Sequence, residues 1–128
     1  MRLLVAIACL LLAAHAAEAA YIHRSAIAGK PIRLIFLFFV NPDCSSRELP
    51  TVRITQNPQH GRVQVSKTQD FPTYPESNSR SVCNSRRVDG IAVSYVAEPG
   101  YLGGDYVGME AIYDSGFELK QYYYITVK

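Results

Sequence analysis

Cysteine spacing is the clearest chemical signal in this 128-residue sequence. Cys9 lies in an apolar stretch at the start of the chain, whereas Cys44 and Cys83 stand 39 residues apart in its polar part. That separation matches neither the C-x-x-C spacing of redox motifs nor the ligand intervals of zinc sites. In an oxidising compartment two such cysteines pair, so we expect one structural disulfide between Cys44 and Cys83.

His60 and Asp105 are the other residues whose types could do chemistry. A catalytic histidine needs a nucleophile and an orienting acid, and the sequence has no G-x-S-x-G elbow, so we expect His60 to pack or hydrogen-bond locally in its turn. Asp105 follows two glycines and can accept backbone N–H groups there. The alternative is a Ca²⁺ site, which would require Asp105, Glu98 and Asp114 to converge. We expect no metal and no cofactor.

Three arginines, Arg80, Arg86 and Arg87, flank the second cysteine in a polar stretch that the disulfide would hold in place. Arginine makes bidentate contacts with carboxylates and phosphates. The three residues are therefore a candidate site for an anionic partner, either an envelope protein or an anionic polysaccharide. The alternative is that Asp89 neutralises them and the loop is only a solvated surface.

The charge balance excludes some partners and favours others. The formal net charge of +2 gives no argument for a nucleic-acid partner. The charge is uneven, however, because residues 20–90 hold ten Lys/Arg against five Asp/Glu, whereas residues 91–128 hold two against five. Tyrosines gather near the C-terminus, at Tyr101, Tyr106 and Tyr122–Tyr124. They offer contact area for sugars or proteins, or they simply suit half-buried strands.

Residues 1–19 have the pattern of a secretory signal peptide. Arg2 gives a positive start, Leu3–Ala14 is free of charge, and Ala17 and Ala19 are the small residues expected before a cleavage site. The apolar run is shorter than the ~20 residues that cross a bilayer as a helix. This length favours a cleaved signal over the alternative, an N-terminal membrane anchor. We expect an exported protein, periplasmic or extracellular, whose residues 20–128 form one domain without a membrane span.

Hydrophobic residues alternate with polar ones along much of this mature chain, and no stretch keeps a helical period of 3.6. Short strands with frequent turn signals predict an all-β fold, an antiparallel immunoglobulin-like β-sandwich of about seven strands. One apolar phase is expected to form a shared core made of Val52, Ile54, Val63, Val65, Ile91, Val93, Tyr95, Val107, Met109, Ile125 and Val127.

Two segments depart from simple alternation. Residues 32–40 are apolar on both faces apart from Arg33, which predicts either a central strand or a strand with one face under a loop. Residues 67–90 are polar and rich in Pro, Ser, Asn and Arg, so we predict a long loop there, tethered through Cys83.

The segment Gln56–Val65 resembles the P-x-H-G-x-V-x-V hairpin of bacterial cadherin-like and immunoglobulin-like modules, the β-sandwich repeats of surface proteins. Tyr95 followed by Pro99–Asp105 is similar to the Y-x-P-x-x-G-Y-x-G-x-D signature of the same modules. The resemblance covers residues 50–128 and implies an exported cadherin-like or immunoglobulin-like sandwich. This chain differs from the family in having one module, a cysteine pair and the insertion at 67–90. It also lacks a D-x-N-D-N calcium linker, so calcium binding is not implied.

These features predict an exported, non-enzymatic β-sandwich protein of the cell envelope that acts as a binding or structural module. The alternative, from another class, is a small secreted enzyme or inhibitor that uses the loop at 67–90.

Overall fold

The computed structural model describes residues 20–128, and the predicted signal peptide at 1–19 lies outside the described residues. In this part of the chain seven strands and one 3₁₀-helix follow one another: β1 (Ile22–Ala26), β2 (Ile32–Phe38), β3 (Thr51–Gln56), β4 (Gly61–Asp70), η1 (Ser79–Ser85), β5 (Val88–Ala97), β6 (Gly103–Ile112) and β7 (Glu118–Val127). The strands form two sheets, in the orders β1-β7-β6-β3 and β2-β5-β4.

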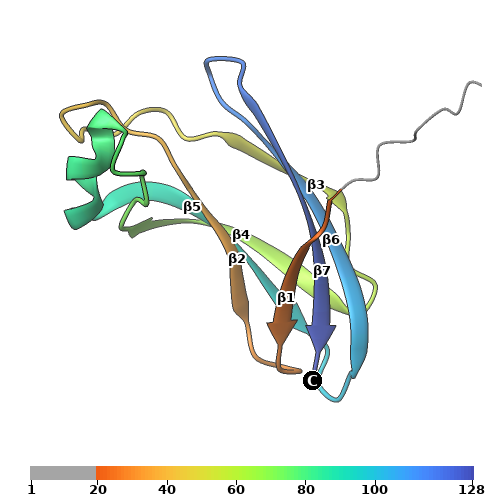
Figure 1. Cartoon of the computed structure of the whole chain (residues 1–128). Coiled ribbons are helices and arrows are strands. Elements are labelled where there is room, and N and C mark those ends of the chain that lie inside the picture. Colours follow the sequence, from red (N-terminus) through yellow and green to blue (C-terminus); the bar gives the residue numbers. More distant parts are fainter. Residues whose placement is uncertain (1–19) are drawn as a thin grey trace, which may run out of the picture.

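The topology is that of an immunoglobulin-like sandwich (Figure 1). Strands β2, β5 and β4 take the places of B, E and D, and β3, β6 and β7 take those of C, F and G. All neighbouring strands are antiparallel except β1, which runs parallel to β7 at the edge of the larger sheet. The all-β sandwich expected from the sequence is therefore confirmed. Strand β1 was not expected, because its sequence IHRSA offers little alternation.

The core lies between the sheets and follows the predicted apolar phase closely. Seven of the eleven expected residues are buried, and Val52, Ile54 and Val63 are partly buried against them. Val65 differs, since 43% of it is exposed. It lies on β4, the last strand of the smaller sheet, where no neighbouring strand covers it.

Strand β2 is an edge strand with one face under a loop, the second of the two expected arrangements. Its register shifts between Arg33 and Ile35, so Leu34 and Leu37 are both buried although they are three positions apart. The bulge explains why this segment shows no clean alternation. The loop approaches at Phe38, whose ring meets that of Tyr74 edge-on at a centroid distance of 5.0 Å.

The prediction of one long loop over 67–90 is wrong in extent. Strand β4 continues to Asp70 and β5 begins at Val88, so only 71–87 lies between them, and it contains η1. The N-cap is Asn78, whose side chain accepts a hydrogen bond from Arg80 N. The end of β4 is polar on both faces, which removes the alternation by which a strand is recognised in sequence.

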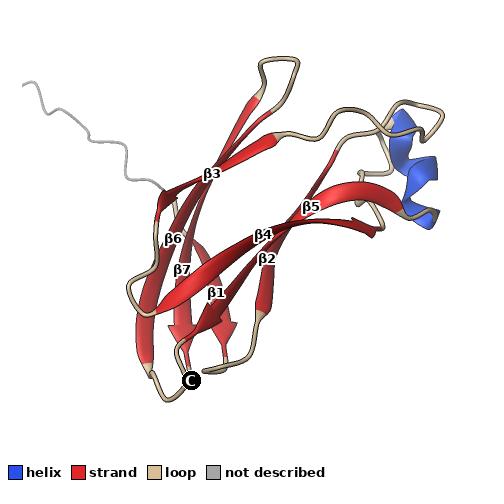
Figure 2. Ribbon diagram, turned by 180° about the vertical axis from the view of Figure 1, so that it is seen from behind, coloured by secondary structure: helices blue, strands red, loops and turns tan. Residues whose placement is uncertain are grey.

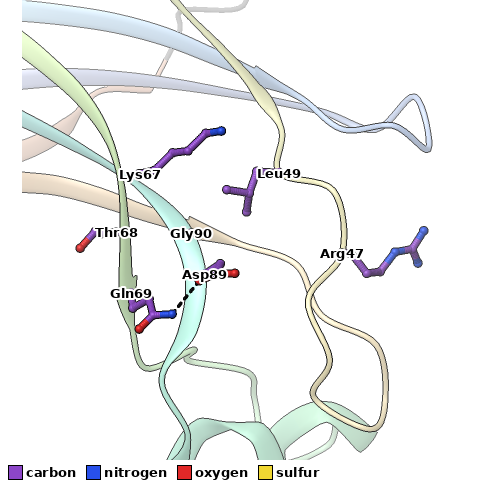
Figure 3. Close-up of a pocket in the computed structure, with 7 residues that line it drawn as sticks. All are labelled: Arg47, Leu49, Lys67, Thr68, Gln69, Asp89 and Gly90. Atoms are coloured by element: carbon purple, nitrogen blue, oxygen red, sulfur yellow. Dashed lines mark hydrogen bonds between the residues drawn. The ribbon is translucent and has the colours of Figure 1, made fainter.

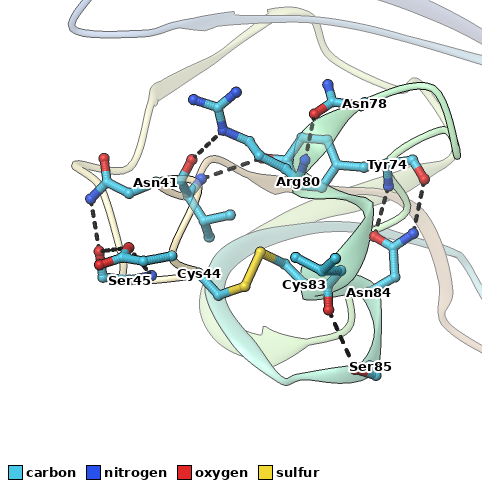
Figure 4. The surroundings of a disulfide bond; sticks show 12 residues. Asn41, Cys44, Ser45, Tyr74, Asn78, Arg80, Cys83, Asn84 and Ser85 are labelled. Carbon is cyan, nitrogen blue, oxygen red and sulfur yellow. Dashed lines mark hydrogen bonds between the residues drawn. A yellow bond between two sulfur atoms is a disulfide. The ribbon is translucent and has the colours of Figure 1, made fainter.

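The expected disulfide joins Cys44 to Cys83, with a Cα–Cα distance of 5.4 Å (Figure 4). Cys83 is fully buried in a small second cluster with Val40 and Val88. Two reciprocal hydrogen bonds between the Asn84 side chain and the main chain of Tyr74, of 2.9 and 2.8 Å, fold the preceding segment onto η1. The bridge thus fixes segment 71–87 to the loop between β2 and β3.

Opening the bridge should destabilise the protein. We expect Cys83→Ala to lower the free energy of unfolding by about 2–5 kcal/mol, as native disulfides of small exported domains typically contribute. Urea denaturation measures the loss. Cys44→Ala is the matched control and should give a similar value, because either change opens the same bridge. Full stability of both variants would contradict a structural role.

Candidate functional site

Among residues 20–128, Asp105 is the centre of the most extensively hydrogen-bonded polar group, and its role is structural. Its carboxylate is almost fully buried on β6. One oxygen accepts from Gln59 N at 2.9 Å and from Tyr106 N at 3.0 Å. The other accepts from His60 N at 3.0 Å and from the Tyr95 hydroxyl at 2.8 Å. Asp105 therefore joins the β3–β4 turn to β5 and β6, and it binds that turn rather than the glycine loop beside it.

The turn, β5 and β6 residues that bind Asp105 form a joint between these elements. The other motif residues pack against this joint. The His60 ring stacks on Tyr101, with centroids 4.0 Å apart and planes inclined by 8°. The Tyr101 hydroxyl donates to Gly104 O at 2.7 Å. Gly61 is required by close approach, because a Cβ there would lie 2.5 Å from Val96 O. His60 thus packs locally, as expected, and both oxygens of Asp105 are engaged by protein donors.

The joint also explains the titration behaviour of Tyr95. Burial, followed by the hydrogen bond to Asp105, raises the pKa of the Tyr95 hydroxyl well above its usual value near 10. In the part of the chain that the structure describes, no cluster of three or more His, Cys, Asp or Glu side chains could hold a metal ion.

The structure separates the three arginines of the candidate anionic site. Arg80 is half-buried, and its Nε donates to Val40 O at 2.8 Å. Its guanidinium also lies 5.7 Å from the centroid of the Phe39 ring. Arg80 thus helps to hold η1 against the segment that follows β2, and it is less exposed than Arg86 and Arg87.

Arg86 and Arg87 follow η1 and are exposed. Within residues 20–128 neither forms an ion pair, and Arg87 lies over the Phe71 ring at 5.2 Å. Asp89 is not within ion-pair distance of either arginine. It accepts instead from Gln69 Nε2 at 2.8 Å and from Ser46 Oγ at 3.3 Å.

A cleft of about 450 Å³ opens beside these residues, between the segment before β3 and the ends of β4 and β5. Figure 3 shows Lys67 reaching from β4 toward Leu49 across the opening. The residues that line the cleft are Arg47, Leu49, Lys67, Thr68, Gln69, Asp89 and Gly90.

The two basic side chains of the cleft differ in their engagement. Arg47 lies 4.4 Å from the centroid of the Phe39 ring and 3.9 Å from Asp114 Oδ2. Lys67 has no carboxylate within ion-pair distance among the described residues. Lys67 also belongs to the core-facing phase of β4, and Arg87 continues the same phase where β5 begins. Asp89 belongs to the same phase and lies between the levels of Lys67 and Arg87, so this side of the sheet carries two cations and one carboxylate.

Lys67 was not among the residues singled out from the sequence. It is far along the chain from Arg86 and Arg87, and only the β4–β5 register brings them to one end of the sheet. The signal that could have found it is the placement of a lysine in the apolar phase set by Val63 and Val65.

Two further surfaces of the molecule are aromatic. Tyr106 and Tyr124 contact each other on the outer face of the larger sheet at a centroid distance of 5.0 Å, and Tyr21 joins Tyr106 at 5.3 Å. A second, apolar hollow of about 270 Å³ lies near the disulfide and is lined by Phe38, Phe39, Tyr74, Tyr113, Ser115 and Phe117.

No family model matches the chain, and comparison with curated proteins and with solved structures likewise found no match. Among residues 20–128 no helix is both long and apolar enough to span a membrane.

Removing the hydroxyl of Tyr95 should destabilise the joint. We expect Tyr95→Phe to lower the free energy of unfolding by about 1.5–3 kcal/mol at pH 7, the contribution of a hydrogen bond to a charged group. Thermal or urea unfolding measures this. Tyr106→Phe, at an exposed tyrosine, is the matched control and should have little effect.

The same variant should reveal the raised pKa of Tyr95. A tyrosine whose pKa is raised by folding contributes stability that is complete below the unfolded value of about 10 and lost as the pH rises through the folded value. Wild type therefore loses this contribution above pH ~10, and Tyr95→Phe has none to lose. The stability gap between them should narrow in alkaline solution, and a constant gap would contradict the assignment.

Proposed function

We propose that this protein is an exported, non-enzymatic β-sandwich binding module of the cell envelope that recognises an anionic partner at the β4–β5 end. One observation carries the proposal. Among residues 20–128, Lys67, Arg86 and Arg87 are exposed there with no carboxylate in ion-pair distance, and the nearby Asp89 accepts hydrogen bonds from Gln69 and Ser46.

The chemistry of these groups defines the partner. The β4–β5 register separates the level of Lys67 from that of Arg87 by four residues, which corresponds to about 13 Å along a strand. A partner that meets both cations must therefore carry several negative charges along its length. An anionic polysaccharide or an acidic face of an envelope protein fits that requirement.

The place of action is part of the same proposal. The signal-peptide pattern at 1–19 and the disulfide are both typical of proteins in oxidising compartments, which points to the periplasm or the cell exterior. The motif residues of the cadherin-like and immunoglobulin-like resemblance support membership of that group of surface modules. Those residues build the joint around Asp105, so they support the fold of the family rather than a ligand.

The proposal can be tested by retention of the purified, oxidised protein on heparin and on immobilised poly-glutamate. Lys67→Met removes one charge and keeps the aliphatic stem, and Arg86→Gln with Arg87→Gln removes two. Each lost charge should weaken binding by up to about fivefold, because an exposed ion pair contributes about 0.2–1 kcal/mol. Retention should also fall as salt rises, since the screening length is about 8 Å at physiological ionic strength and about 3 Å at 1 M.

Lys120→Met is the matched control, because Lys120 is an exposed lysine on β7 in the other sheet. It removes the same charge and should leave retention close to that of wild type. If all variants behave alike, bulk charge explains the retention and the proposed surface is wrong. If only the arginine pair matters, the partner binds at the loop and the cleft has no part in recognition.

A further inference from the structure

Each sheet has two edge strands whose outer main-chain groups have no neighbouring strand: β1 and β3 in the larger sheet, β2 and β4 in the smaller. Such edges can pair with a strand of another chain, and stable proteins usually make them short or irregular. Three of the four edges follow this rule. Strand β1 has five residues, and β2 and β3 each contain a register shift and follow a proline, Pro31 and Pro50.

Strand β4 is the exception. It has ten residues, contains no proline and pairs with β5 in one unbroken register from Gly61 to Asp70. Most of its side chains are exposed, including Val65. No described hydrogen bond beyond the β5 ladder reaches its main chain.

The ladder shows which main-chain groups of β4 are free. Glu98 N donates to His60 O at 2.9 Å, one step before the first residue pair of the β4–β5 register. Hydrogen-bonded pairs alternate in an antiparallel ladder, so the even-numbered residues of β4 face β5 with their N–H and C=O groups. The odd-numbered residues, among them Val65 and Lys67, direct theirs outward.

We propose that this edge binds a second copy of the same chain, antiparallel, so that two three-stranded sheets become one sheet of six strands. The two-fold axis passes by Ser66, which places Val65 opposite Lys67 of the second copy. Arg62 then stands opposite Asp70 of the second copy, and the symmetry repeats this pair at the other end of the strand. Free outward groups meet free outward groups in this register, because it pairs odd residues with odd residues.

The sequence of β4 favours its own copy over an unrelated strand. Arg62 and Asp70 are placed symmetrically about Ser66 on one face, so a single strand supplies both members of each ion pair. Asp70 already pairs with Arg33 of its own chain, and Arg62 of the second copy would join that ion pair. Opposite charges directly across two strands stabilise pairing, whereas like charges oppose it. On the other face, the aliphatic stem of Lys67 can cover the exposed side chain of Val65. The inference is independent of the proposed anionic partner, since main-chain pairing requires no third molecule.

The test is sedimentation equilibrium of the purified, oxidised protein from about 10 µM to about 1 mM, the range in which small interfaces associate. Wild type should form dimers as its concentration rises. Val65→Pro removes an outward N–H and leaves every bond to β5 in place. It should weaken dimerisation at least about tenfold, because symmetry removes two hydrogen bonds. Its melting temperature should stay close to that of wild type.

Gln64→Pro is the control for the direction of the groups, because it removes an N–H that faces β5 and should lower the melting temperature strongly. A charge test avoids proline altogether. Arg62→Glu should weaken dimerisation by opposing Asp70. Adding Asp70→Lys should restore dimerisation although it also breaks the intrachain Arg33–Asp70 ion pair, and Asp70→Lys alone reports the effect of that loss on the melting temperature. The proposal is overturned if wild type stays monomeric at ~1 mM. It is equally overturned if dimers form but neither Val65→Pro nor Arg62→Glu weakens them.

Discussion

The buried carboxylate of Asp105 is the constraint on which the closed end of the sandwich depends. A carboxylate removed from water must find hydrogen-bond donors, because its desolvation otherwise costs several kcal/mol. Four donors bind the Asp105 carboxylate. Two are main-chain N–H groups of the β3–β4 turn, one is the Tyr95 hydroxyl on β5, and one is a main-chain N–H of β6. Asp105 lies on β6 of the larger sheet and Tyr95 on β5 of the smaller one, so this carboxylate links the two sheets at this end.

The other end of the sandwich lacks such a joint and is built differently. There Figure 2 shows β3 and β5 drawing apart toward η1, and the cleft lined by Lys67 and Leu49 lies between the two sides. A covalent bond takes the place of polar contacts here, because Cys44–Cys83 fastens segment 71–87 to the loop between β2 and β3 and leaves the cleft open beside it. The molecule thus has one end sealed by a hydrogen-bonded carboxylate and one end held open beside a disulfide.

The sequence predicted the sealed end well and the open end poorly, for physical reasons. In the segments 56–65 and 99–105, turn residues and alternating strands are close in sequence, so local rules apply. The sequence did not show that Arg80 contacts the Val40 carbonyl group and the Phe39 ring, which lie 40 and 41 residues away along the chain. Lys67 was missed because its distance from Arg87 depends on the β4–β5 register, and the sequence alone does not give that register.

The polar end of β4 connects these observations. Where two sheets pack closely, the inner phase of a strand must be apolar, and alternation reveals it. Where the sheets diverge, the inward-facing side chains of a strand reach water. Lys67 and Gln69 can therefore follow Val63 in the inward-facing positions of β4. Because the end of β4 lacks hydrophobic alternation, the sequence predicted a loop there. At the same place the outer edge of β4 has free main-chain groups, and its inner face carries Lys67. Both proposed interactions therefore involve β4.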